Sequence, residues 1–92
     1  MIVRISTESQ YEIPEEHHEK LNELDNACVV AVDGGNEDGF HSAFEELLAL
    51  VRSKGHETEG DDLRESDVIV PPPDISFADA GREFTGEGLI PD

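Results

Sequence analysis

Apolar residues recur at helical spacing between Asn36 and Gly55, which is the best-specified stretch of the sequence. They form an apolar arc of about 160° on a helix, and this arc consists of Phe40, Ala43, Phe44, Leu47, Leu48, Leu50 and Val51. Asn36 suits the N-cap position, and Arg52 and Lys54 suit the last turn. Gly55 stands where a left-handed C′ residue is expected. The pattern therefore predicts a core-building helix over 36–55.

A second helical pattern precedes this one and starts at Pro14, a residue suited to the first turn of a helix. One arc holds His17, Leu21, Leu24, Cys28, Ala31 and Val32. Val29 and Val30 fall outside the arc, so the helix is either covered more broadly or less regular near its end. Gly34 and Gly35 end the pattern. Because the link is so short, residues 14–55 are predicted to form an antiparallel αα-hairpin.

Strand patterns flank the helical hairpin on both sides. Residues 1–13 contain two short runs, MIVRIS and QYEI, separated by the polar Thr7-Glu8-Ser9, and they predict a β-hairpin. Residues 66–70 (SDVIV) predict a third strand beside that hairpin, after an acidic loop over 56–65. The order of these patterns indicates a single α+β domain over 1–92, with a small three-stranded sheet packed on the αα-hairpin.

The remainder of the chain is predicted from its prolines and a short apolar repeat. Pro71-Pro72-Pro73 stops the third strand and makes 71–75 a Pro-rich linker. Ser76 suits an N-cap, and Phe77, Ala80 and Phe84 then recur at helical spacing, which predicts a short helix over 76–85. Residues 86–92 form a tail whose Leu89 and Ile90 could dock on the core.

The charge of the chain excludes several classes of function. It carries 23 acidic and 6 basic residues, a formal net charge of −17. No basic patch is available for phosphates, so nucleic-acid binding and simple attraction to anionic lipid are both excluded. An acidic, aromatic-poor chain can be disordered, but the periodic segments favour a folded domain with an acidic surface, as in salt-loving organisms. No apolar run has the length of a membrane span, which indicates a soluble, cytoplasmic protein.

The residues that could bind metal do not form a recognisable site. His17 and His18 are adjacent and point about 100° apart on a helix, and His41 and His56 have no evident partner. A calcium loop with Gly39 as its sixth residue places Asn36, Asp38 and Glu45 at the third, fifth and twelfth positions. The first position is then Gly34, which has no carboxylate, so the site is rejected.

The remaining candidate chemistry is that of Cys28, the single cysteine of the chain. It lies on the apolar arc of the first helix, near acidic residues that would raise its pKa, and it is predicted to be a buried structural residue. The sequence therefore predicts no catalytic residue, no metal site and no cofactor.

The order of segments carries a family resemblance that no single motif shows. The segments are MIVRI, QYEI, LNELD, FHSAFEELLALVRSKG, SDVIVPPPD and EGLIPD. In this order the chain resembles the PspAA family of small proteins associated with phage-shock protein A, in its halophilic archaeal type. Thr7-Glu8-Ser9 departs from the family pattern, in which a glycine is expected in the hairpin turn. The resemblance implies no known enzyme activity and no known cofactor.

The resemblance also implies a function and a partner. The chain is expected to be a non-enzymatic accessory or regulatory protein of phage-shock protein A, a coiled-coil, membrane-remodelling protein of the envelope-stress response. It would then be cytoplasmic, or peripheral to the membrane through its partner.

The expected contact surface lies on the sheet, because an edge strand offers unpaired backbone groups. Its residues are Val68, Ile69, Val70, Tyr11 and Ile13. Two alternatives stay open, an acidic module that binds a small ligand or cation, and a small enzyme with a pocket of convergent polar groups.

Overall fold

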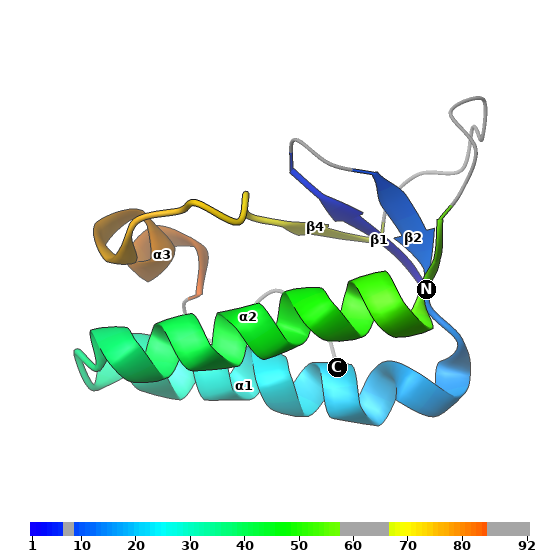
Figure 1. Cartoon of the computed structure of the whole chain (residues 1–92). Helices are drawn as coiled ribbons and strands as arrows, with labels where there is room; N and C mark the ends of the chain where they lie inside the picture. The colour runs from blue at the N-terminus through cyan, green and yellow to red at the C-terminus, as the bar shows by residue number, and fades with distance from the viewer. Residues whose placement is uncertain (7–8, 58–66, 85–92) are drawn as a thin grey trace.

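A small sheet lies over a pair of long helices in the computed structural model, which describes residues 1–6, 9–57 and 67–84 (Figure 1). In chain order the elements are β1 (Ile2–Ile5), β2 (Gln10–Glu12), the 3-10 turn η1 (Glu15–His17), α1 (His18–Asp33), α2 (Glu37–Lys54), β3 (His56–Glu57), β4 (Val68–Val70) and α3 (Phe77–Glu83). The predicted α+β class is confirmed, and so are the N-terminal strand pair and the short last helix.

Some predicted segments fall outside the described residues. These are Thr7 and Glu8 of the hairpin turn, residues 58–66, and residues 85–92 with the docking tail. Most of the acidic loop and the position of the tail therefore stay predictions, and the turn type, which the sequence leaves open, stays open.

The sheet has the strand order β3-β2-β1-β4 in the described part of the chain. β1 pairs with β2 in the antiparallel sense, with Val3 opposite Tyr11, and with β4 in the parallel sense, with Val3 opposite Val68. The third predicted strand therefore does lie beside the N-terminal hairpin, and it forms one edge of the sheet. β3 forms the other edge by pairing with β2.

The acidic loop predicted over 56–65 is wrong at its first two residues, because His56 and Glu57 form β3. They pair with Glu12 and Tyr11, and the Ser9 hydroxyl donates to Oε1 of Glu57 at 2.7 Å. Both side chains are exposed. A two-residue edge strand that buries no apolar side chain leaves no alternating pattern, so the sequence had no signal for it.

Side chains of the neighbouring strands β1 and β4 alternate between the two faces of the sheet, as the pleat of a strand requires. Those that face the core are Val3, Ile5, Val68 and Val70, and all are buried. Arg4 and Ile69 lie between them in sequence and are exposed. One face of the sheet therefore covers α1 and α2. The other face, which we call the open face, exposes Arg4 and Ile69, although Ile2 and Gln10 on the same side are only 6% and 8% exposed.

The predicted αα-hairpin is confirmed, and its turn depends on one glycine. Gly35 adopts a left-handed conformation with φ of 67°, which a residue with a side chain rarely adopts. The Asn36 amide donates to the Ala31 carbonyl at 2.8 Å, and the Asn36 side chain accepts from the Gly39 amide at 3.0 Å. Asn36 is therefore the N-cap of α2, as predicted.

Gly55 is not the left-handed C′ residue that the sequence predicted. Its backbone is extended, with φ of −82° and ψ of 154°, and it leads directly into β3. A glycine is needed here for space, since a Cβ atom would lie 2.5 Å from the Val51 carbonyl oxygen and 2.7 Å from Cδ1 of Ile13. The end of α2 therefore lies against the sheet instead of turning away from it.

The buried side of α1 extends beyond the apolar arc, which is the first of the two alternatives that the sequence left open. Val29, outside the predicted arc, is 8% exposed, whereas the next residue, Val30, is 71% exposed. Asp25 is fully buried, which its polarity gave no reason to expect. Pro14 precedes η1 in an extended conformation as its N-cap, so the prediction that it occupies the first turn is off by one residue.

Phenylalanines join α3 to the helical hairpin. The ring centroid of Phe40 lies 5.4 Å from those of Phe44 and Phe84 and 6.0 Å from that of Phe77. Such edge and offset contacts stabilise a core beyond the area that they bury. The chain thus returns after β4 to close the end of the core that the small sheet leaves uncovered.

Candidate interaction surfaces

The five residues predicted to contact a partner differ sharply in exposure. Val68, Val70 and Ile13 are 4%, 2% and 1% exposed and belong to the core. Tyr11 is half-buried, and Ile69 is 61% exposed. Only Ile69 therefore presents most of its side chain to solvent, on the strand that the sequence singled out.

Tyr11 and Ile69 do not belong to one surface. Tyr11 and Val68 lie opposite Val3 on either side of β1, so their side chains share the face that covers the helices. Ile69 follows Val68 and points to the opposite face. The structure therefore separates the predicted set and leaves Ile69 as its accessible member.

The neighbours of Ile69 on the open face are polar. Arg4 of β1 is paired in register with Ile69 of β4 and with Gln10 of β2. The Arg4 guanidinium donates from Nε and from Nη2 to Oε1 of Gln10, both at 3.4 Å. Gln10 is only 8% exposed, so its part is to hold the Arg4 side chain. We call Ile69, Arg4 and the outer edge of β4 the β4 surface. It combines an exposed aliphatic side chain, a cation and a strand edge.

β4 is held to β1 at both of its ends. Before the strand, the Asp67 amide donates to the Ile2 carbonyl at 2.8 Å, and the Asp67 carboxylate accepts from the Ile2 amide at 2.8 Å. After the strand, the Ser6 amide donates to the Val70 carbonyl at 2.9 Å. A strand fixed in this way presents its outer edge in one conformation, which lowers the entropic cost of binding.

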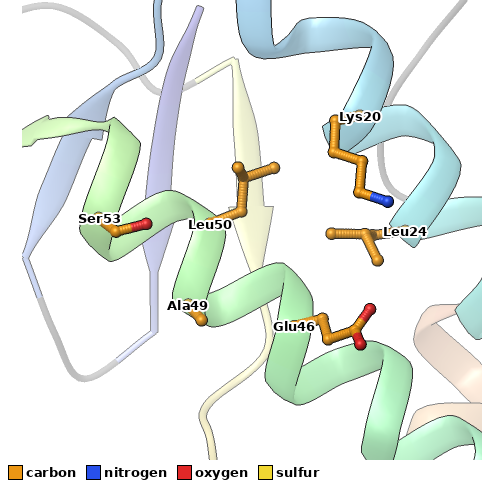
Figure 2. A pocket seen from close by; sticks show the side chains of 6 residues that line it. All are labelled: Lys20, Leu24, Glu46, Ala49, Leu50 and Ser53. Atoms are coloured by element: carbon orange, nitrogen blue, oxygen red, sulfur yellow. The ribbon is translucent and has the colours of Figure 1, made fainter.

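A second surface lies between the two long helices, where Figure 2 shows side chains of α1 and α2 on either side of an open groove of about 370 Å³. We call it the hairpin groove. Its lining residues are Lys20 and Leu24 of α1 and Glu46, Ala49, Leu50 and Ser53 of α2. The sequence contains no signal for this groove, because the groove depends on how the two helices are rotated about their axes when they pack.

The polar residues at the rim of the hairpin groove are unequally paired. Lys20 Nζ lies 3.6 Å from Oε2 of Glu23 in an exposed ion pair one helical turn apart. Glu46 is also exposed, and it makes no ion pair within the described residues. The groove itself is therefore lined by one cation, Lys20, and one anion, Glu46, and the neighbouring Glu23 adds a second acidic charge.

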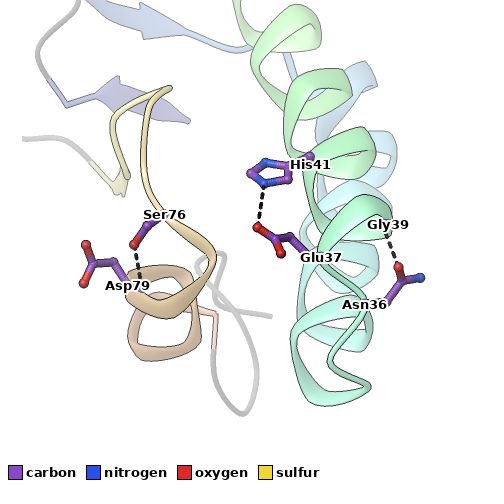
Figure 3. Close-up of polar contacts among 6 residues, drawn as sticks. All are labelled: Asn36, Glu37, Gly39, His41, Ser76 and Asp79. Atoms are coloured by element: carbon purple, nitrogen blue, oxygen red, sulfur yellow. Dashed lines mark hydrogen bonds and ion pairs between the residues drawn. The ribbon is translucent and has the colours of Figure 1, made fainter.

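The histidines do not converge on a metal site within the described residues, and three of the four make local side-chain contacts. His17 and His41 lie 3.7 Å from the carboxylates of Glu16 and Glu37, the second pair being drawn in Figure 3. Nε2 of His18 lies 3.2 Å from the Ile13 carbonyl.

The acidic residues do not gather round a cation site either. In the part of the chain that the structure describes, no three His, Cys, Asp or Glu side chains are placed to share a metal ion. Asn36, considered above as a calcium ligand, directs its side-chain oxygen to the Gly39 amide (Figure 3). This contact satisfies one free amide of the helix start.

Cys28 is a buried structural residue, as predicted. Its side chain is fully buried, and burial, reinforced by the nearby charge of Asp25, raises the pKa of the thiol from 9.0 to about 12. Thiolates are the reactive form of cysteine. The Cys28 thiol is therefore protonated and shielded at neutral pH, which is unsuited to nucleophilic chemistry.

Comparison with known proteins gives one match. The family model described as PspA-associated protein (PspAA) matches residues 1–92, in agreement with the resemblance inferred from the ordered segments. No curated protein and no solved structure is significantly similar to the chain. Within the described residues, none of the helices is long and apolar enough to cross a membrane.

Proposed function

Because the chain belongs to the PspAA family of PspA-associated proteins, we propose that it binds PspA as a non-enzymatic accessory or regulatory protein of the membrane stress response. The observation that carries this proposal is the family match over residues 1–92. The protein would act in the cytoplasm and reach the membrane surface only through its partner. An acidic exterior supports this, since it is repelled by anionic lipid.

The β4 surface is the contact that we propose for this partner. Ile69 is one of two large aliphatic side chains that are mostly exposed in the described residues, and it lies on an edge strand. An extended segment that adds to the edge of β4 would gain main-chain hydrogen bonds and cover Ile69. Arg4, beside it, would favour a carboxylate in the partner segment.

Co-purification tests the association directly. The tagged full chain, with PspA encoded by the same genome, is captured in molar salt, which screens attraction between distant charges. We expect PspA to be retained in a fixed stoichiometry. Failure to retain PspA under these conditions would refute the proposed function.

Two matched substitutions then test the surface. Ile69→Glu replaces the exposed aliphatic side chain of β4, and Val30→Glu makes the same kind of change on α1, where Val30 is the other large exposed aliphatic residue. We expect Ile69→Glu to lower PspA retention at least about tenfold, the effect of a buried interface anchor, and Val30→Glu to leave it unchanged. Circular dichroism of both variants checks that the fold is intact. If the two variants retain PspA equally well, β4 is not the contact.

A further inference from the structure

The hairpin groove has the geometry of a seat for a helix. Its α2 wall consists of residues at positions i, i+3, i+4 and i+7, namely Glu46, Ala49, Leu50 and Ser53, and its α1 wall of an i, i+4 pair, Lys20 and Leu24. Residues with these spacings lie in rows along a helix. The groove therefore runs along the two helix axes, and side chains with helical spacing can fill it from above.

The α2 wall of the groove offers two apolar side chains to a partner. Leu50 packs on the core but is only partly buried, and Ala49 beside it is exposed. The short side chain of Ala49 allows a neighbouring backbone to approach the α2 wall closely. An aliphatic residue placed over Ala49 and Leu50 would contact both, whereas Leu24 is 6% exposed and offers little area.

Charge decides what kind of helix fits. Lys20 is already paired with Glu23, while Glu46 on the other wall makes no ion pair within the described residues. The chain as a whole has a formal charge of −17. A field of this sign attracts cationic partners and raises their association rate.

We propose that the hairpin groove binds a cationic amphipathic helix of a partner protein, with aliphatic residues over Ala49 and a lysine or arginine against Glu46. This site is separate from the β4 surface, and the inference does not depend on the proposed association with PspA. A second copy of the chain is disfavoured as the occupant, because two chains that each carry a formal charge of −17 repel one another. A small ligand is disfavoured because the groove is open to solvent along its length.

A designed peptide is a suitable probe because it carries only the stated chemistry. The peptide has about 20 residues, a length of about 30 Å as a helix, with leucines in an i, i+3, i+4, i+7 stripe and lysines elsewhere. A second peptide has glutamate at every lysine position. Fluorescence anisotropy with the full chain in about 0.15 M salt measures binding, because charges are still felt over about 8 Å there. We expect the lysine peptide to bind and the glutamate peptide not to bind.

Matched variants separate the groove from general charge attraction. Glu46→Lys and Glu45→Lys each change the formal charge from −17 to −15, and residue 45 is exposed but outside the groove. Ala49→Gln fills the groove, and Ala78→Gln makes the same change at an exposed position of α3. We expect each groove variant to weaken peptide binding about 3- to 10-fold relative to its control, the size of one charge pair or one lost apolar contact.

Three results would overturn the proposal. The first is that the lysine peptide does not bind, and the second is that each groove variant and its control weaken binding equally, as attraction to the whole surface would. The third is a dimer of the chain in sedimentation that Ala49→Gln dissociates, which would make a second copy the occupant. Loss of peptide binding with retained PspA binding would leave the proposed function intact.

Discussion

Replacing Gly55 by alanine places a methyl group where the end of α2 meets the sheet. The added Cβ would lie 2.5 Å from the Val51 carbonyl oxygen, 2.7 Å from Cδ1 of Ile13 and 3.0 Å from Cβ of Tyr11. Non-bonded carbon atoms prefer separations of about 3.5 Å or more. Ile13 is 1% exposed and has little room to move, and the Val51 oxygen belongs to the backbone of the helix.

The cost has two components. Overpacking of a filled core costs about 1–3 kcal/mol. The Val51 carbonyl also accepts the hydrogen bond of the Gly55 amide at 2.9 Å, and a methyl group that displaces this oxygen weakens that bond by about 1 kcal/mol. We therefore expect Gly55→Ala to lower the free energy of unfolding by about 2–4 kcal/mol, a large share of the roughly 5–14 kcal/mol expected for 92 residues.

Urea denaturation followed by circular dichroism measures this change. Urea is preferable to guanidinium because guanidinium is itself a salt and would screen the acidic surface, and the chain has no tryptophan for fluorescence. Gly81→Ala is the first control. Gly81 lies within α3, and a Cβ atom added there would lie 4.0 Å from Cγ1 of Val32 in α1, an ordinary van der Waals contact. We expect this substitution to add about 0.5–1 kcal/mol through helix propensity. Gly35→Ala is the second, with a loss of about 1–2 kcal/mol from its positive φ alone.

Asparagine at position 55 distinguishes crowding from backbone conformation. A left-handed cap tolerates asparagine as well as glycine, whereas a crowded extended residue tolerates neither asparagine nor alanine. We expect Gly55→Asn to be at least as destabilising as Gly55→Ala. A Gly55→Asn protein as stable as the parent would refute the reasoning and restore the left-handed cap.

Three further predictions concern the core and the charge. Leu47→Ala removes a side chain that is 1% exposed and should lower the free energy of unfolding by about 2–5 kcal/mol in the same urea assay; a near-neutral result would mean that this arc does not face the core. The thiol of Cys28 ionises near pH 9.0 when unfolded and near 12 when folded, so stability should be full below pH 9 and fall between pH 9 and 12. Urea titrations should show this fall in the parent and a smaller one in Cys28→Ala. Thermal melts should move down as salt falls from molar to about 0.01 M, where the Debye length is about 30 Å, and melts that ignore salt would contradict a salt-adapted surface.

The sequence predicted two kinds of feature, the helix caps, which depend on local hydrogen bonds, and the apolar arcs of helices, which depend on burial of one side. The Asn36 cap follows from an amide oxygen that reaches the third residue of the helix, and the helical arcs follow from apolar spacing. Ser76 is a further case, because its hydroxyl accepts from the Asp79 amide at 3.2 Å (Figure 3). Ile69 was predicted only as one member of a contact set, and its exposure separates it from Val68 and Val70, which are buried.

The parts that the sequence did not predict depend on how elements meet. Gly55 follows the last helical residue and so resembles a left-handed helix cap. The need for glycine at this position comes instead from Ile13 and Tyr11, which belong to a segment distant in sequence and leave no room for a Cβ atom. β3 exists through backbone pairing alone. The hairpin groove arises from the rotation of α1 against α2, and the burial of Asp25 likewise depends on what packs over that helix. None of these contacts leaves a periodic pattern in a single segment.

The parallel pairing of β1 with β4 fixes the order in which the strands can pair while the chain is being synthesised. The two strands are joined by hydrogen bonds between residues 65 positions apart, such as Ile2 and Asp67. At translation rates of about 5–20 residues per second, β1 waits roughly 3–13 s for its second partner. During synthesis it can pair only with β2, while the αα-hairpin forms from neighbouring residues. β1, an inner strand of the finished sheet, is therefore an edge strand of the nascent chain for several seconds. During this time it is exposed to other nascent chains on the same polysome.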